Sequence, residues 1–284
     1  MDRRSIFTLT LLLFAITLLA TAGCIAASDT THLSEQEARQ FPVVSFDETP
    51  IHYADVNGVT LAYREFGSGE PLLLIEGFGA TIEGWNETFI GILASKYHVY
   101  TYDHRGMGQS SAYTTTPSIY QFSDDAAALM TVLGYDSMHV YGVSMGSTTA
   151  QQLTIDHPEK VRKLILDSST YSIRIPETKT LLGLIESRAL DPTVPEGKRQ
   201  EAEANLAWNG SFDGLSGIKK DVMLIVGTDD ILTPDAVSVR IAGEIDGSWL
   251  LRFKDVPHAG YHYAPVEYGE SVLFFLGMDE SPGM

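Results

Sequence analysis

Cysteine is nearly absent from this 284-residue chain, which contains only Cys24, so an intramolecular disulfide is excluded. Basic residues are also scarce, because 19 Lys and Arg stand against 37 Asp and Glu and leave a formal net charge of −18. This charge argues against binding to nucleic acid and against charge-driven binding to anionic lipid. The length and the 44% content of hydrophobic residues suit one globular domain with a sizeable core.

The N-terminus has the pattern of an export sequence. Two arginines precede an apolar run over residues 6–22, which has about the length of a signal-peptide core or a short membrane span. The small residues that follow and end at Cys24 resemble a prokaryotic lipobox, although Thr21 departs from the commoner leucine. We therefore predict that residues 1–23 are a signal peptide and that Cys24 is the lipidated new N-terminus. Plain secretion and an uncleaved anchor are the alternatives, and all three place the following domain outside the cytoplasmic membrane.

The remainder of the chain has the pattern of an α/β domain. Residues 24–50 are polar and are expected to form a tether. Asn57-Gly58 separates two strand-like runs and predicts a β-hairpin. Apolar strands then alternate with helical stretches, which implies right-handed crossovers and a mostly parallel, doubly wound sheet. The predicted core covers residues 51–170 and 218–278.

A Gly-x-Ser-x-Gly motif at residues 142–146 stands between a strand-like run, residues 138–141, and a helix-like stretch, residues 147–157. Between a strand and a helix this motif forms a nucleophile elbow, a sharp turn that exposes the serine hydroxyl above the sheet. Glycine is needed at both ends, because a side chain there would collide where strand and helix pass closely. The motif alone is weak, but its context predicts Ser144 as a nucleophile.

A nucleophilic serine needs a base to accept its proton, and the base needs an orienting carboxylate. Both residue types follow late strands in this chain. The apolar run at residues 222–226 is followed by Asp230, and the strand-like run at residues 249–253 is followed by His258. Serine, aspartate and histidine therefore occur in the order that a nucleophile elbow requires.

Several motifs together resemble the α/β-hydrolase fold superfamily, over nearly all of the chain after residue 53. They are LLLIEGFG at residues 72–79, DHRGMGQS at residues 103–110, the Gly-to-Pro segment at residues 227–234, and His258 with a proline seven residues on. The resemblance implies an α/β-hydrolase fold in which Ser144 is the nucleophile, Asp230 the acid and His258 the base. It also implies that the backbone amides of Phe78 and Met145 form the oxyanion hole.

Rivals exist for two of these positions. His262 lies four residues after His258, but the spacing to the following proline favours His258. The pair also suggests a metal site, yet no Glu or Cys stands nearby at metal-ligand spacing, so we expect neither a metal nor a cofactor. Asp229 is adjacent to Asp230, and the family spacing selects Asp230; Asp167, after an earlier strand, is a second place for the acid.

The alternation of strands and helices breaks at residues 171–217. This insertion holds three prolines and two short helix-like pieces, residues 181–190 and 196–208, and the resemblance implies that it is a short helical lid over the nucleophile. Most of its apolar residues are expected to pack the lid on the core. Trp208 is the residue that we expect to touch substrate.

Glu76 departs from many members of the superfamily, which have histidine before the loop glycine. A carboxylate at this place could repel anionic substrates or favour cationic ones. In the alternative interpretation the side chain turns away and accepts hydrogen bonds from the loop backbone.

These patterns predict a serine hydrolase that cleaves carboxylic ester-type bonds of a small molecule through an acyl-enzyme. Serine at the elbow argues against the dehalogenase and epoxide-hydrolase branches, which use aspartate there. The same triad in relatives cleaves C–C, lactone, thioester or amide bonds, and a non-catalytic surface binding module is the alternative outside enzymes. The expected partners are the substrate and, through the N-terminal anchor, the membrane; the oligomeric state stays open.

Overall fold

The structure, a computed structural model, describes residues 41–112 and 117–280. The predicted signal peptide, the predicted lipidation site Cys24 and residues 25–40 of the predicted tether lie outside this part of the chain. Among the described residues, no helix has both the length and the apolar character needed to cross a membrane.

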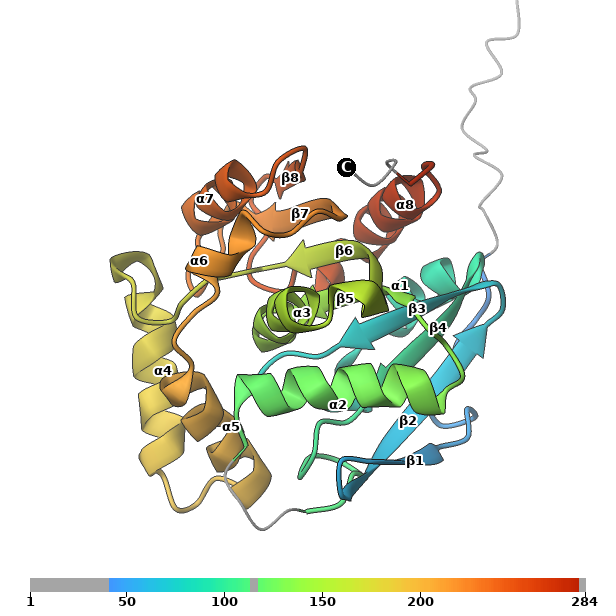
Figure 1. The fold of residues 1–284 in the computed structure, drawn as a ribbon, viewed down its shortest axis with the longest axis horizontal. Helices are drawn as coiled ribbons and strands as arrows, with labels where there is room; N and C mark the ends of the chain where they lie inside the picture. The colour runs from blue at the N-terminus through green and yellow to red at the C-terminus, as the bar shows by residue number, and fades with distance from the viewer. Residues whose placement is uncertain (1–40, 113–116, 281–284) are drawn as a thin grey trace, which may run out of the picture. The chain divides into compact units, whose positions relative to one another are not determined.

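Within the described residues, eight strands form one sheet with the order β1-β2-β4-β3-β5-β6-β7-β8 (Figure 1). The pairings of β1 with β2 and of β2 with β4 are antiparallel, and the pairings from β4 through β3 to β8 are parallel. The strands are β1 (His52–Val56), β2 (Val59–Gly67), β3 (Glu70–Ile75), β4 (Tyr97–Tyr102), β5 (Met138–Val143), β6 (Val161–Asp167), β7 (Asp221–Gly227) and β8 (Trp249–Phe253). The prediction of a mostly parallel, doubly wound sheet is confirmed.

Helices cover both faces of this sheet. Helices α2, α3 and α7 share one hydrophobic cluster with the strands, whereas α1 and α8 share the other. The helices are α1 (Glu87–Ala94), α2 (Ile119–Val132), α3 (Met145–Asp156), α4 (Lys179–Leu190), α5 (Glu196–Ala207), α6 (Phe212–Leu215), α7 (Asp235–Glu244) and α8 (Pro265–Leu276), with short 3-10 helices η1 (Ile82–Gly84), η2 (Pro158–Lys160), η3 (Pro176–Thr178) and η4 (Gly260–His262).

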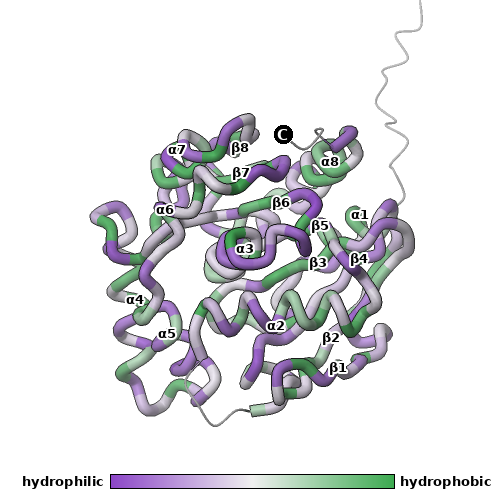
Figure 2. Tube along the Cα trace, in the orientation of Figure 1, coloured by the Kyte–Doolittle hydropathy of each residue, from purple (hydrophilic) through white to green (hydrophobic). Residues whose placement is uncertain are grey.

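Strand β3 shows how the apolar residues divide between the two layers. Leu72 and Leu74 belong to the cluster with α1 and α8, whereas Leu73 and Ile75 belong to the cluster with α2, α3 and α7. All four side chains are fully buried, because helices cover both faces of a central parallel strand. Figure 2 shows β3 coloured as hydrophobic over most of its length.

Residues 41–50 pack on the domain, although the sequence predicted a polar tether as far as residue 50. The Phe46 side chain is buried, and its ring lies edge-on to the ring of Phe66 at a centroid distance of 5.7 Å. The Phe46 amide donates to Glu87 Oε1, at the start of α1, at 2.8 Å. Because burial of a phenyl ring contributes roughly 2 kcal/mol, the packed domain begins before residue 51.

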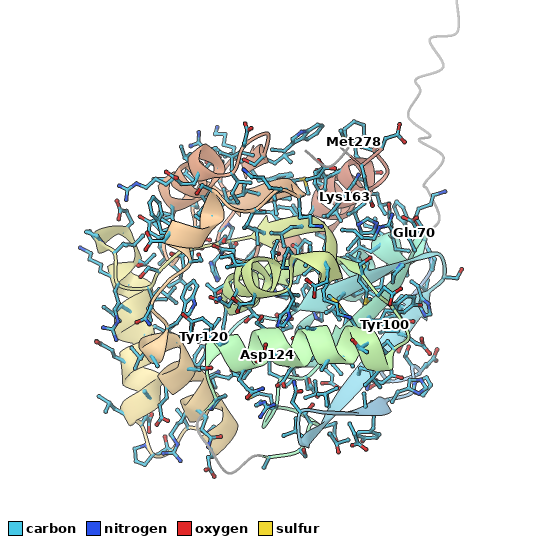
Figure 3. The ribbon with its side chains drawn as sticks, in the orientation of Figure 1. Glu70, Tyr100, Tyr120, Asp124, Lys163 and Met278 are labelled. Carbon is cyan, nitrogen blue, oxygen red and sulfur yellow. The ribbon has the colours of Figure 1, made fainter. Side chains whose placement is uncertain are left out.

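Lys163 on β6 holds the C-terminal end of α8. Its Nζ donates to the carbonyl oxygens of Phe275 and Leu276 at 3.2 and 3.3 Å and also to that of Met278 (Figure 3). The last carbonyls of a helix have no intrahelical donor and carry partial negative charge, so a buried ammonium satisfies them. This contact fixes the helix that follows the His258 loop.

Candidate active site

Ser144 occupies a sharp turn between β5 and α3. Its backbone has φ 54° and ψ −118°, a conformation that residues with a side chain rarely adopt. The flanking glycines permit this turn, since a Cβ on Gly142 would lie 2.3 Å from the carbonyl oxygen of Gly146. A Cβ on Gly146 would lie 2.0 Å from the carbonyl oxygen of Ile75. The local geometry is that of the nucleophile elbow that the motif predicted.

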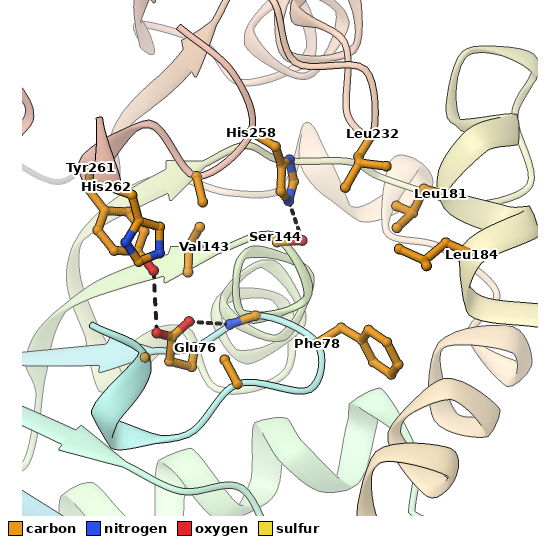
Figure 4. Close-up of a pocket in the computed structure, with 14 residues that line it drawn as sticks. Glu76, Phe78, Val143, Ser144, Leu181, Leu184, Leu232, His258, Tyr261 and His262 are labelled. Atoms are coloured by element: carbon orange, nitrogen blue, oxygen red, sulfur yellow. Dashed lines mark hydrogen bonds between the residues drawn. The ribbon is translucent and has the colours of Figure 1, made fainter. Parts of the chain in front are cut away.

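The structure brings the three predicted side chains together at the carboxyl ends of the parallel strands. Asp230 lies in the turn after β7, and His258 lies in the loop after β8. His258 Nε2 is 3.0 Å from Ser144 Oγ (Figure 4), and His258 Nδ1 is 2.8 Å from Asp230 Oδ2. Both separations are hydrogen-bond distances, so the imidazole connects the hydroxyl to the carboxylate.

The surroundings of Asp230 favour its ionised form. Burial raises the pKa of this carboxyl, but the hydrogen bond and the charge of His258 lower it more, and the pKa is below its usual value. The amide and the hydroxyl of Thr233 also donate to Asp230, each at 2.8 Å. An ionised carboxylate at this place holds the imidazole with its proton on Nδ1 and leaves Nε2 free to accept.

The rival carboxylates have other environments. Asp229 is exposed at the surface. Asp167 accepts hydrogen bonds from the hydroxyls of Tyr141 at 2.6 Å and of Ser168 at 2.9 Å. Burial raises the pKa of Asp167 to about 7, and Ser168, which donates to it, accepts from the Ala259 amide in the His258 loop at 3.0 Å.

His262 lies apart from the nucleophile. It lies in η4 and lines the pocket above Ser144 that is described below, with its ring centre 4.2 Å from that of Tyr261. In residues 41–112 and 117–280, no three His, Cys, Asp or Glu side chains are grouped so that they could hold a metal ion.

The loop after β3 lies against the nucleophile. A Cβ on Gly77 would be 3.2 Å from Ser144 Cβ. Over the described part of the chain, neither the Phe78 amide nor the Met145 amide donates a hydrogen bond to another residue. Met145 is the first residue of α3, where the amides have no intrahelical acceptor. Both predicted oxyanion donors are therefore available to a substrate oxygen.

Glu76 begins this loop and accepts a hydrogen bond from the loop backbone, as the alternative interpretation of the sequence expects. Its Oε2 accepts from the Gly77 amide at 2.8 Å, and its Oε1 accepts from the Tyr261 hydroxyl at 3.3 Å. The side chain nevertheless lines the pocket. Burial raises the pKa of Glu76 to about 8, because the two hydrogen bonds compensate only part of the lost hydration.

Glu201 contacts the loop after β3, and the sequence did not predict this contact. It lies on α5, is fully buried, and accepts from the Gly79 amide through Oε2 at 2.7 Å. Lys198, one turn earlier, places its Nζ 5.4 Å from the centre of the Phe78 ring. Helix α5 thus holds the loop on the side away from Glu76. A glutamate in a polar helix gives no indication of such a contact, because its partner lies 122 residues away.

The pocket above Ser144 has a volume of about 280 Å³. Its walls come from the loop after β3, from helix α4, and from the loops that follow β5, β7 and β8 (Figure 4). Leu181 and Leu184 of α4 line it, so part of the predicted lid faces the pocket.

Trp208 differs from the prediction that it touches substrate. It is 2% exposed, lies in a cluster with Ile119, Phe122 and Met145, and is absent from the lining of the pocket. Its indole nitrogen donates to Gln152 Oε1 at 3.2 Å, which satisfies the buried N–H. Trp208 packs the end of α5 onto the core, beneath the residue that follows the nucleophile.

Known proteins resemble both the sequence and the fold. Residues 70–206 match the family described as alpha/beta hydrolase fold. The chain is 24% identical over 262 residues to a putative non-heme bromoperoxidase of Mycobacterium tuberculosis, covering 77% of this chain and 98% of the relative. It is 25% identical over 260 residues to a putative carbamate hydrolase of Azorhizobium caulinodans, and the match covers 79% of this chain and 98% of that relative.

Among solved structures, the enol-lactonase of Burkholderia xenovorans superposes with a TM-score of 0.69 at 23% identity, over 80% of this chain and all of that one. Similarity at this level of identity establishes the fold. The relatives include hydrolases and a putative peroxidase, so the common property is an enzymatic fold and not one substrate. The matched family, the sheet order and the elbow together show that the chain has the α/β-hydrolase fold.

Proposed function

We propose that this protein is a serine hydrolase that cleaves carboxylic ester-type bonds of a small molecule. The observation that carries the proposal is the continuous chain of contacts from Ser144 Oγ to His258 Nε2 at 3.0 Å and from His258 Nδ1 to Asp230 Oδ2 at 2.8 Å. Nucleophile, base and orienting acid stand in the relation that covalent acyl transfer requires.

In the proposed mechanism, neutral His258 accepts the proton of Ser144 as the hydroxyl oxygen attacks the ester carbonyl. Asp230 stabilises the imidazolium that forms. The imidazolium then gives its proton to the leaving alcohol, and the serine ester remains. Water, deprotonated by the same imidazole, hydrolyses this ester and restores the enzyme.

The tetrahedral intermediates place a negative charge on the former carbonyl oxygen. The amides of Phe78 and Met145 are the proposed donors to that oxygen, and the start of α3 adds positive potential at the same point. Because backbone amides make these contacts, the identity of either side chain has little direct influence on the rate.

Labelling with a fluorophosphonate probe tests the proposal. The wild-type protein should be labelled and should hydrolyse a series of acyl esters, whereas Ser144→Ala should lose both properties. Ser187→Ala, which removes an exposed hydroxyl on α4, is the matched control and should retain both. Labelling that survives Ser144→Ala would refute the assignment, and an unreactive wild-type protein would favour a binding module.

The bond cleaved is part of the proposal. A panel of acyl esters, lactones, thioesters, amides and vinylogous diketones, assayed with Ser144→Ala as the blank, separates ester hydrolysis from the other reactions of the triad. Turnover of the esters at the highest kcat/KM supports the proposal. A clear preference for any other class would replace it.

We also propose, from the sequence, that the mature protein is attached to the outer side of the cytoplasmic membrane by a lipid on Cys24. Mass spectrometry of the N-terminal peptide from membrane extracts tests this. A diacylglycerol-modified Cys24 at the N-terminus is the expected result. An unmodified Cys24 would leave secretion or an uncleaved anchor.

A further inference from the structure

The two ends of the pocket differ in chemistry, and Ser144 lies between them (Figure 4). At one end Leu181 and Leu184 of the lid approach Leu232. At the other end Glu76 lies with the rings of Tyr261 and His262. An ester bound at the nucleophile extends one substituent toward each end.

The polar end carries a buried acid without a compensating cation. Glu76 is 3% exposed, and the neighbouring charges that act on it most strongly are those of Asp167 and Asp103, both acidic. Among the described residues that line the pocket, none is a lysine or an arginine. A carboxylate so placed is stabilised by a cation that enters from the pocket.

Both hydrogen-bonding contacts of Glu76 also suit the ionised form. The Gly77 amide and the Tyr261 hydroxyl both donate to it, so its two oxygens act as acceptors. An acceptor carboxylate attracts a positive group and repels a negative one. His262 adds no opposing charge at neutral pH, because burial lowers its pKa.

We propose that the Glu76 end of the pocket binds an ammonium-bearing group of the ester substrate, while the apolar end receives a hydrocarbon group. This inference rests on the proposed esterase function, since it names the substrate class of the same site. The net charge of −18 draws cations toward the protein and disfavours anionic esters.

A pair of esters that differ only in charge tests the proposal. One is a choline ester, and the other is its neutral isostere, in which a tert-butyl group replaces the trimethylammonium group. A quaternary ammonium cannot donate an N–H hydrogen bond, so the comparison isolates charge. The wild-type enzyme should prefer the choline ester by roughly tenfold or more in kcat/KM, mostly through KM.

Glu76→Gln should reduce this preference to about one, because the amide keeps the shape and loses the charge. The matched control is Glu186→Gln on α4, which removes the same charge from an exposed position of the lid and should retain the preference. Equal kcat/KM values for the two esters in the wild type, or an undiminished preference in Glu76→Gln, would overturn the proposal.

Direct binding separates failure of this inference from failure of the proposed function. Calorimetry with Ser144→Ala protein should show that choline binds more tightly than its neutral tert-butyl analogue, by a similar factor. If the wild type reacts with the fluorophosphonate but choline binds no better than the analogue, the esterase proposal stands and the cation site is wrong. If choline binds selectively but no ester is cleaved, the cation site stands and the esterase proposal is wrong.

The preference should also depend on pH. The ratio of kcat/KM values cancels any pH dependence of the chemical step, which acts on both esters alike. It should rise from about pH 6 to about pH 9, because the pKa of Glu76 is about 8 and only its ionised form attracts the cation. The other titratable groups around this carboxyl are Asp103 and His104 after β4, Asp167 at the end of β6, Glu201 on α5, and Tyr261 and His262 in η4. If the ratio of the two kcat/KM values rose with pH as much in Glu76→Gln as in the wild type, the effect would belong to those other groups.

Discussion

Two carboxyl groups around the active site are each 3% exposed: Asp230, which contacts His258, and Glu76, which lines the pocket. The pKa of Asp230 lies below its usual value, whereas that of Glu76 is raised to about 8. Burial raises both values. The difference comes from the partners, because Asp230 faces an imidazole that becomes positively charged, while Glu76 faces an amide, a phenol and two further acids. The charge of a buried acid thus depends on its contacts more than on its depth.

The largest effect should come from the carboxylate that contacts the imidazole. Asp230→Asn should lower kcat/KM by about 10³- to 10⁴-fold, because the amide no longer holds the correct tautomer or stabilises the imidazolium. Asp167→Asn is the comparison, since Asp167 is buried nearby and contacts Tyr141 and Ser168 instead. It should lower kcat/KM by less than about tenfold. Steady-state kinetics measure both losses. A larger loss in Asp167→Asn than in Asp230→Asn would indicate that Asp167 is the acid.

Glu201 should act by positioning the loop that carries Phe78, through its contact with the Gly79 amide. Glu201→Ala should lower kcat by about tenfold with little change in KM, since losing an oxyanion donor altogether costs about 10²- to 10³-fold. Glu201→Gln keeps an oxygen that accepts from the Gly79 amide and should recover most of the rate. Glu196→Ala, an exposed position of α5, should leave the kinetics unchanged. If both Glu201 variants lowered kcat and raised KM by similar factors, the result would indicate general disorder of the loop after β3.

The lid should contribute to substrate binding through Leu184 and not through Trp208. Leu184→Ala should raise KM for long-chain esters several-fold, because about 1–2 kcal/mol of apolar contact is lost. Trp208→Phe should leave the chain-length preference intact and reduce the free energy of unfolding by about 1–2 kcal/mol, since it removes the hydrogen bond to Gln152. Kinetics with a graded ester series and denaturant unfolding measure both effects. A changed chain-length preference in Trp208→Phe would restore its predicted role in binding.

The smallest effect concerns stability and pH. The pKa of Glu76 is about 8 in the folded protein and near 4.5 without its environment, so the folded state holds this proton more tightly. Its contribution to stability is therefore complete below the unfolded pKa and is lost as the pH rises through about 8. Glu76→Gln does not titrate.

The Tm of Glu76→Gln should therefore rise relative to the Tm of the wild type between about pH 5 and about pH 9. Differential scanning fluorimetry provides the measurement. Glu201 and Asp167, whose pKa values burial also raises, titrate in both proteins, so the part of their effect that does not depend on the charge of Glu76 cancels in the difference. The Tm difference between Glu186→Gln and the wild type should stay constant over this pH range. A constant Tm difference for Glu76→Gln would contradict the raised pKa of Glu76.

Local patterns of sequence were enough to predict the elbow and the sheet. The Gly-x-Ser-x-Gly motif requires close packing of β5, α3 and β3, and the Cβ distances at Gly142 and Gly146 show why only glycine fits. Apolar runs predicted buried parallel strands because both faces of such strands are covered. Chain order indicated where the acid and the base lie, since loops that follow neighbouring parallel strands emerge on one edge, and the resemblance to the superfamily selected Asp230 and His258.

The errors have one physical cause. Trp208 was expected at the substrate because it is a large apolar residue in a lid, but the same property suits it to the interior, where it is 2% exposed. Residues 41–50 looked polar enough for a tether, yet one ring, that of Phe46, and a few hydrogen bonds attach them to the domain. Composition does not show which side of an element faces inward when its apolar stripe is short.

The sequence by itself determined the class of the fold, the turn at Ser144 and the identity of the residues proposed for catalysis. The fold class and the turn follow from the periodicity of apolar residues and from the glycines of the motif, and the proposed catalytic residues follow from their order in the chain and from the resemblance to the superfamily. Only the tertiary structure decided that Glu201 holds the Gly79 amide, that Trp208 lies in the interior, and that Glu76 faces the pocket among acids. Such contacts join segments far apart in the chain, and their energies depend on burial and charge that exist only after folding.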